Sequence, residues 1–80
     1  MKFKSEKVEL RGISNMQSKN GNVYYMVNVE TMDGTSYSLY ASESTGFQEG
    51  LSKGAHVYVT RELKMYKGNE QYDVVKVEKA

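Results

Sequence analysis

Short runs of β-branched and aromatic residues recur along the chain and predict a mostly β fold. The clearest run is VYYMVNVE, residues 23–30, in which valine occupies positions 23, 27 and 29. Neighbouring residues in a strand point to opposite faces, so this alternation indicates one buried and one exposed face. Polar segments that contain glycine separate the runs, as turns do. The predicted strands cover residues 4–15, 23–31, 35–42, 55–65 and 71–79.

The segments between these runs predict how the strands connect. Residues 18–22, SKNGN, predict a turn or a flexible hairpin tip. The dipeptide Asp33-Gly34 predicts a two-residue hairpin between the second and third strands. Residues 66–70, YKGNE, predict the turn between the last two strands. Gly12 interrupts the first run and predicts a bulge or bend there.

Residues 42–54, SESTGFQEGLSKG, follow a different pattern. Phe47 and Leu51 are the only large apolar residues of this segment, and they are four positions apart. That spacing suits one or two helical turns, which Gly46 and Gly50 would keep short. The segment therefore predicts a short helical or loop plug that covers the end of a sheet.

Three strands, a covering segment and a final hairpin define the predicted architecture. Closing a small sheet into a barrel removes its open edges, which otherwise promote aggregation. Five strands arranged in this way, with a plug between the third and fourth, indicate a five-stranded OB-fold barrel. We expect one OB-fold domain over residues 1–80, since 80 residues suffice for one small core. An SH3-like barrel is the alternative.

Composition narrows the classes of function. The chain has no cysteine and no proline, and 11 Lys and Arg face 10 Asp and Glu for a net charge of +1. This balance argues weakly against strong phosphate binding, because local distribution of charge matters more. The N-terminal ten residues lack the apolar run of a signal peptide or membrane span, so we expect a cytoplasmic protein without a membrane partner. Seven tyrosines are many for so small a domain, and a small core is not expected to hold them all.

Strand alternation assigns the aromatic residues of the second and third strands to faces. The residues predicted to point into the core are Val23, Tyr25, Val27, Val29, Tyr37, Leu39 and Ala41. The residues predicted to share the outer surface are Tyr24, Met26, Asn28, Ser38 and Tyr40. In the fifth strand, Val75 and Val77 are expected to point inward, which would leave Val74 outside.

The predicted outer surface suits unstacked bases. A base stacked on an exposed aromatic ring gains about 1–3 kcal/mol whatever its identity. Surface tyrosines also occur on sheets simply because they help strands to pair, but two on adjacent strands beside Met26 favour binding. Cations for phosphate contacts are expected at the hairpins on either side. The candidate cations there are Lys19, Arg61, Lys64 and Lys67, and Tyr66 adds a further ring.

The sequence offers no constellation for catalysis. His56 is the only histidine, it lies in a predicted strand, and no cysteine accompanies it. Glu43 and Glu49 have no evident acid–base partner. We therefore expect a protein that is not an enzyme and that uses neither a metal nor a cofactor.

The succession NGNVYYMVNVE, DGTSYSLYAS and GAHVYVTRELKMYKGNEQYDVVKVEKA resembles the small OB-fold single-stranded DNA-binding proteins of phages and mobile elements. The filamentous-phage protein is the best-known member of this family. The resemblance assigns Lys19, Gly21 and Tyr24 to a flexible DNA-binding loop, with Met26 beyond it. It assigns Tyr66, beside Lys67 and Gly68, to an aromatic hairpin tip. Ser42 and Val74 stand where the family carries basic residues.

The resemblance implies a homodimer that coats single-stranded DNA without sequence preference, in replication or transfer of phage or mobile-element DNA. Single-stranded RNA remains an alternative ligand. A second alternative is a protein-interaction OB module that serves a helicase, polymerase or conjugation machine through the same surface. A third is a structural protein whose tyrosine and methionine patch is its own dimer interface.

Overall fold

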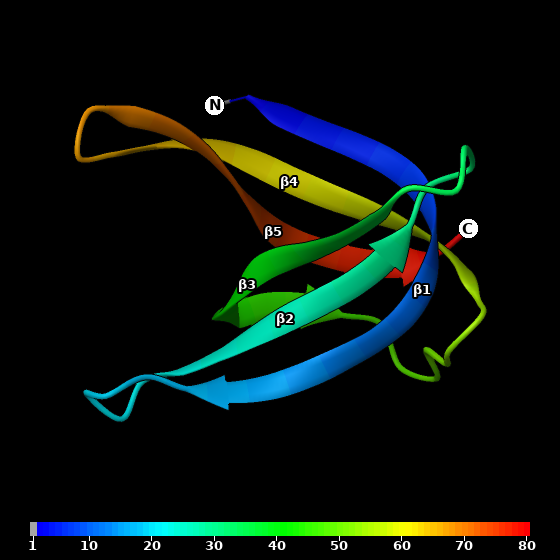
Figure 1. The fold of residues 1–80 in the computed structure, drawn as a ribbon, viewed down its shortest axis with the longest axis horizontal. Coiled ribbons are helices and arrows are strands. Elements are labelled where there is room, and N and C mark those ends of the chain that lie inside the picture. The colour runs from blue at the N-terminus through cyan, green and yellow to red at the C-terminus, as the bar shows by residue number, and fades with distance from the viewer. Residues whose placement is uncertain (1) are drawn as a thin grey trace.

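Five strands form one closed sheet in the computed structural model, which describes residues 2–80 (Figure 1). Around the sheet the strands follow the order β1-β2-β3-β5-β4, and β1 also pairs with β4 to close it. All neighbours are antiparallel except β3 and β5, which run parallel. The strands are β1 (Phe3–Gln17), β2 (Val23–Glu30), β3 (Ser36–Phe47), β4 (His56–Tyr66) and β5 (Asn69–Lys79).

The core is built almost entirely from valine. Nine hydrophobic residues are buried, and seven of them are valines contributed by four of the strands. Small β-branched side chains fill a narrow interior and also favour the extended backbone, so one residue type serves both needs. Tyr25, Leu39, Phe47 and Leu51 pack against this core from its edges. The buried residues are Val8, Leu10, Val27, Val29, Ala41, Val57, Val59, Val74 and Val77.

The predicted helical plug is wrong. β3 continues to Phe47, turns follow at residues 49–50 and 53–54, and no helix forms within residues 2–80. The described residues therefore contain no helix that could cross a membrane. The backbone of this segment finds partners in β5 instead, since Gly46 pairs with Lys76 and the N–H of Gln48 donates to the carbonyl of Val77. Phe47 and Leu51 nevertheless cover the core, as expected of the segment.

The β2–β3 turn differs in length from the predicted one, whereas the β4–β5 turn lies within the predicted residues 66–70. The β2–β3 hairpin is real, but its loop has three residues, because the N–H of Thr31 donates to the carbonyl of Thr35 at 2.8 Å. Gly34 takes a φ of 89°, the left-handed residue that ends such loops. The two-residue turn lies between β4 and β5 instead, where Lys67 and Gly68 both have positive φ.

Two bulges set which residues point inward. In β1, Leu10 pairs with Val29 and Gly12 with Asn28, so the ladder shifts register beside Gly12 as predicted. In β5, Thr60 faces Lys76 and Arg61 faces Val74, which leaves Val75 as the extra residue. Val74 is therefore buried at 1% exposure, and the prediction that it points outward is wrong. A bulge allows Val74 and Val77 to share the core although they are three positions apart.

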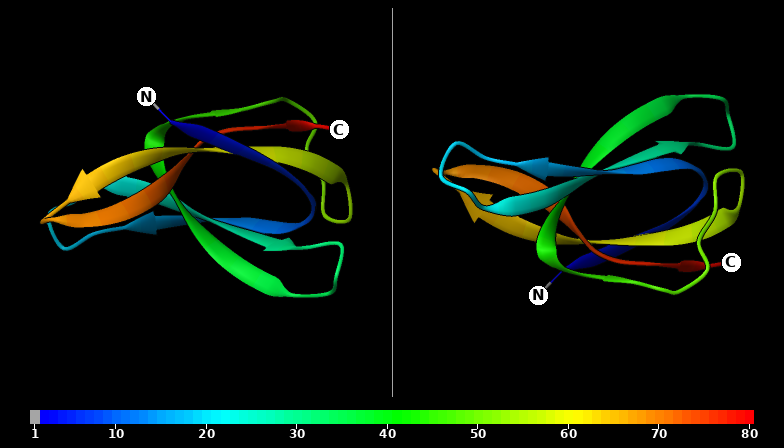
Figure 2. Two further views of the ribbon diagram at one scale, coloured as in Figure 1. Left: turned by 90° about the horizontal axis from the view of Figure 1, so that it is seen from above. Right: turned by 90° about the horizontal axis from the view of Figure 1, so that it is seen from below.

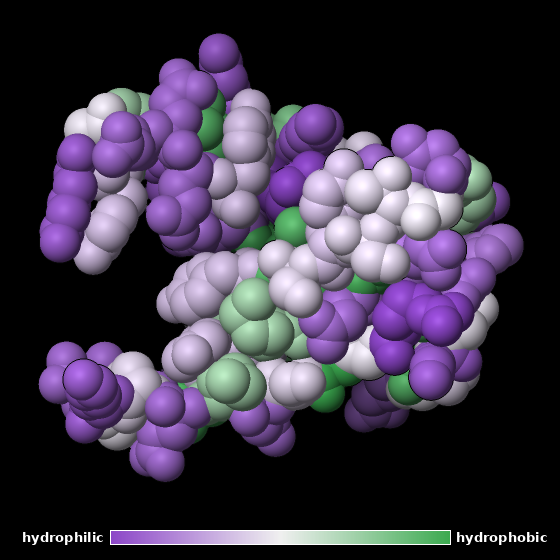
Figure 3. Space-filling model, viewed as in Figure 1, coloured by the Kyte–Doolittle hydropathy of each residue, from purple (hydrophilic) through white to green (hydrophobic). Residues whose placement is uncertain are grey.

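Two hairpins extend past the core at one end of the molecule. The tips of β1–β2 and β4–β5 lie at the same end in Figures 1 and 2. The surface is hollowed between them in Figure 3, where purple, hydrophilic residues gather at both tips. Val23 lies in the first of these hairpins and is 37% exposed, and Tyr37 of β3 is 51% exposed, so the prediction that both lie in the core is wrong. The alternation of β2 is correct there, but the core ends before the strand does.

The β4–β5 turn provides a test of backbone conformation alone. Neither Gly68 nor Gly12 has any atom within 4 Å of an added Cβ, but Gly68 has a φ of +79°. We expect Gly68→Ala to lower the free energy of unfolding by about 1–2 kcal/mol, the cost of a left-handed L-residue. Gly12→Ala is the matched control and should change it by less than about half as much. Urea denaturation of both variants measures this, and equal losses would contradict the explanation.

Candidate nucleic-acid interface

The outer surfaces of β2 and β3 meet in one patch, as the alternation predicts. The ladder places Met26 opposite Tyr40 and Asn28 opposite Ser38. The rings of Tyr24 and Tyr40 lie 5.6 Å apart between centroids and are tilted by 31°. The Ser38 hydroxyl donates a hydrogen bond of 2.6 Å to Oδ1 of Asn28. We call these five residues, Tyr24, Met26, Asn28, Ser38 and Tyr40, the β2–β3 face.

Two residues of β1 extend the β2–β3 face and were missed by the sequence analysis. Met16 pairs with Tyr24, and Ser14 pairs with Met26. Cross-strand partners point to the same side of a sheet, so Met16, 41% exposed, lies beside the Tyr24 ring. The signal that could have found them is the alternation that restarts at the Gly12 bulge. In Figure 3, green and pale residues gather over β2 and the adjoining part of β1.

The hairpin tips carry three of the predicted site residues. Lys19 is exposed in the β1–β2 turn, where the N–H of Ser18 donates to the carbonyl of Asn22. Tyr66 and Lys67 are exposed at the β4–β5 tip, and Nζ of Lys67 lies 5.4 Å from the Tyr66 ring centroid. The two tips flank the hollow seen in Figure 3, so their cations lie on either side of it.

Arg61 and Lys64 do not join the β2–β3 face. They are three positions apart on β4 and therefore point to opposite sides of the sheet. The Lys64 amine forms ion pairs with Glu62 at 3.8 Å and Asp73 at 4.0 Å on the outer side. The Arg61 guanidinium lies on the inner side, 3.7 Å from the carboxylate of Glu6. Both cations therefore have protein carboxylates as neighbours.

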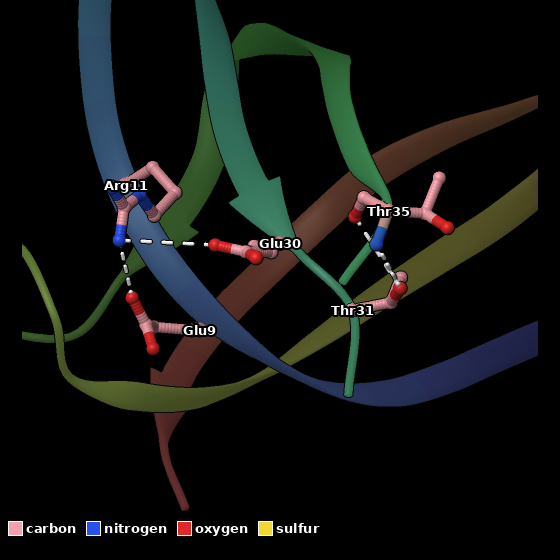
Figure 4. A network of polar contacts seen from close by, with 5 residues as sticks. All are labelled: Glu9, Arg11, Glu30, Thr31 and Thr35. Carbon is pink, nitrogen blue, oxygen red and sulfur yellow. Dashed lines mark hydrogen bonds and ion pairs between the residues drawn. The ribbon is translucent and has the colours of Figure 1, made fainter. Parts of the chain in front are cut away.

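An acidic cluster marks the end of the sheet away from the hairpin tips (Figure 4). Nη1 of Arg11 lies 2.6 Å from Glu9 and 3.8 Å from Glu30. The hydrogen bond to Glu9, and then the charges of Glu9 and Glu30, raise the pKa of Arg11 above its usual value. Its charge thus offsets one of the two carboxylates, which leaves the cluster negative.

The adjoining β2–β3 loop adds a further negative charge. Hydrogen bonds from Thr31, and then Thr35, to the carboxylate lower the pKa of Asp33 below its usual value. Asp33 therefore remains ionised at neutral pH. A polyanion is repelled from this end of the sheet and attracted toward Lys19 and Lys67 at the other.

The β2–β3 face itself is aromatic, sulfur-bearing and uncharged. Tyrosine rings and methionine side chains offer flat, polarizable surfaces, and the hydroxyl and amide groups can exchange hydrogen bonds with a ligand. Such a surface suits planar, uncharged groups, whereas the flanking lysines suit anions. Within residues 2–80 no group of three His, Cys, Asp or Glu is placed to hold a metal ion.

Comparison with known proteins yields no relative from which this site could be read. No family model matches the chain, and neither a curated protein nor a solved structure matches it.

Proposed function

We propose that this protein is a small OB-fold barrel that binds single-stranded DNA without sequence preference. The observation that supports the proposal most is the Tyr24–Tyr40 ring pair, 5.6 Å between centroids, on the uncharged β2–β3 face between two lysine-bearing hairpins. The closed five-stranded sheet, with β1 shared between β2 and β4, agrees with an OB-fold. Strands two and three and the two hairpins are where OB-folds bind oligonucleotides.

Base stacking supplies the sequence-independent part of the proposed affinity. Bases lie on Tyr24 and Tyr40, with Met26 and Met16 beside them. Every base has a flat face, so this contact discriminates little between sequences. Asn28 and Ser38 already satisfy each other by a hydrogen bond, so they need not select a particular base edge.

Phosphate contacts come from the cations beside the β2–β3 face. Lys19 and Lys67 lie at exposed hairpin tips and meet the phosphates first. Lys64 contacts a phosphate only when its ion pairs with Glu62 and Asp73 are broken. Tyr66 adds a further ring at the β4–β5 tip, 59% exposed. Arg61 reaches the ligand only from the inner side of β4.

A salt titration with oligothymidylate tests the proposal. We expect micromolar or tighter binding at low salt. The logarithm of the binding constant should fall with the logarithm of salt concentration by about 0.7 for each phosphate neutralised. Contacts by two to four cations therefore give a slope between about −1.4 and −2.8. No binding at low salt would overturn the proposal.

The cellular role that suits this activity is replication or transfer of phage or mobile-element DNA, by a homodimer that coats the strand. Such a role places replication or transfer proteins among its partners. Light scattering on the free protein and on its DNA complex tests the stoichiometry, since a coating dimer binds in multiples of two protomers.

The second candidate function is a protein-interaction OB module that assists a helicase, polymerase or conjugation machine. The lack of charge on the β2–β3 face favours it, because protein interfaces are depleted of charge at their centre and enriched in tyrosine and methionine. An oligonucleotide affinity that barely responds to salt, together with capture of one replication or transfer protein, would decide for this candidate.

A further inference from the structure

A pocket opens at the mouth of the closed sheet, on its inner side. Its volume is about 250 Å³. That is below the roughly 300–1,000 Å³ of pockets for drug-sized ligands, so it suits one planar group rather than a chain. The pocket shares no residue with the β2–β3 face. Its walls are Lys4, Glu6, Val29, Tyr37, Leu39 and Arg61.

Charged side chains on the inner side of two paired strands distinguish this pocket. Along β1 the inner positions change from buried Val8 to Glu6 and then Lys4, and the β4 partner of Lys4 is Arg61. A core-facing position ordinarily takes an apolar residue, because a charge there loses hydration. Departures from this pattern concentrate at functional sites. At the mouth itself Lys4 is exposed and the Glu6 side chain is 43% exposed, whereas the Arg61 side chain is largely covered.

The geometry leaves the charged groups available to a ligand. Arg61 and Glu6 lie 3.7 Å apart, which is too far for a hydrogen bond between them. The guanidinium carbon of Arg61 lies 5.8 Å from the ring centroid of Tyr72, which holds it over that ring. The Arg61 side chain is 20% exposed, so its field acts in a partly desolvated space. Tyr37, 51% exposed, provides a ring at the same mouth.

The pocket lies within reach of a strand bound to the β2–β3 face. Tyr37 and Tyr40 belong to the same strand but to opposite sides of it, and three residues of β3 span roughly 10 Å. Within residues 2–80, β3 pairs with β5 only from Ala41 onward. The preceding half of β3 therefore has an open edge. A nucleotide chain that crosses this edge passes from the Tyr40 ring to the Tyr37 ring.

We propose that this mouth pocket binds a single guanine base of the strand held on the β2–β3 face. The inference rests on the proposed function for its ligand but on separate residues. The base lies against Tyr37, with Val29 and Leu39 as the floor. Arg61 and Lys4 donate to its O6 and N7 atoms, and the Glu6 carboxylate accepts from its N1–H and N2–H groups.

Hydrogen-bond complementarity selects guanine over the other bases. Guanine alone presents two adjacent donor groups, which match the two oxygens of a carboxylate, beside the acceptors that arginine contacts. Thymine offers one N–H between two carbonyl oxygens, which a carboxylate repels. Adenine and cytosine each offer one amino group, so Glu6 would contact either with a single oxygen. The protein thus combines stacking without preference on one face and a preference for guanine at one position.

Two oligonucleotides test this inference, a short oligothymidylate and the same chain with one guanine. We expect the guanine-containing chain to bind about 5- to 150-fold more tightly, the range of a good bidentate base contact. Glu6→Leu should reduce this preference to what the Arg61 and Lys4 contacts retain, without weakening binding of oligothymidylate, since loss of a carboxylate does not repel phosphates. Glu49→Leu, with the same change of charge in the β3–β4 loop, should keep the preference.

The outcomes separate this inference from the proposed function. Equal affinity of the wild-type protein for both oligonucleotides, or a guanine preference that is undiminished in Glu6→Leu, overturns the mouth pocket and leaves the proposed function standing. A stronger preference for a single adenine or cytosine also overturns it. Free deoxyguanosine provides a readout that needs no strand. If it shifts the NMR signals of Tyr37 and Leu39, and thymidine does not, the pocket stands even where no oligonucleotide binds.

Discussion

Replacement of Tyr24 by alanine is expected to weaken binding of oligothymidylate about 5- to 150-fold, which corresponds to about 1–3 kcal/mol of lost base stacking. Tyr24 lies at the end of the β2–β3 face nearest the β1–β2 turn, with Met16 opposite it on β1 and the Tyr40 ring at 5.6 Å. Its removal takes away one ring and also a neighbour that holds the second. Fluorescence titration at one fixed salt concentration measures the loss.

The control for this result is Tyr58→Ala. Tyr58 is exposed at 42%, whereas Tyr24 is half-buried, and Tyr58 lies on β4, where it pairs with Lys7 and Glu78 rather than with β2 or β3. Its loss should change affinity less than about twofold, as for a surface change away from the contact. Because the Tyr24 and Tyr40 rings touch, the double variant should lose less than the sum of the single losses. Equal effects of Tyr24→Ala and Tyr58→Ala would show that the β2–β3 face is not the contact.

Replacement of Val27 by alanine is expected to lower the free energy of unfolding by about 2–3 kcal/mol, from two lost methyl groups and the cavity they leave. Val27 has 0% exposure and lies between two residues of the β2–β3 face. A domain of this length has a total stability of about 4–12 kcal/mol, so the loss is a large fraction of it. The midpoint of urea denaturation should fall accordingly.

Val23→Ala is the matched control, since it makes the same chemical change on the same strand. Val23 is 37% exposed in the projecting hairpin, so we expect a loss below about 0.5 kcal/mol. A small loss for both variants would mean that β2 does not hold the core. A large loss of stability for both variants would mean that Val23 is packed as closely as Val27, contrary to its 37% exposure.

The strands could be predicted from the sequence because apolar and polar residues alternate along them whatever the form of the turns. The valines of β2 and β4 repeat with the period of a strand, and burial of Val27, Val29, Val57 and Val59 follows from it. The helical plug failed because spacing alone cannot tell which partner satisfies a backbone. Gly46 and Gln48 bond to β5, a strand some thirty residues away. A glycine marks the bulge of β1, but no glycine marks the bulge of β5, which is why the predicted phase of β5 was wrong at Val74.

The sequence placed the aromatic part of the candidate site correctly and its cations only in part. Tyr24 and Tyr40 meet because alternation and an antiparallel hairpin fix both their sides and their register. Arg61 and Lys64 diverge because a separation of three positions reverses the side of a strand. Glu6 and Asp73, which pair with Arg61 and Lys64, lie on other strands, so the sequence around these cations does not indicate the two ion pairs.

A core of valine with no buried tyrosine separates two tasks along each strand. In β2 the positions that hold the protein together and those that meet the solvent alternate one by one. The outward side chains can therefore be exchanged over evolutionary time while the inward ones stay constant. Closely related chains could then acquire different ligands while every intermediate sequence still folds. The tyrosines and methionines of this chain are one set of outward side chains on a scaffold that would also fold with others.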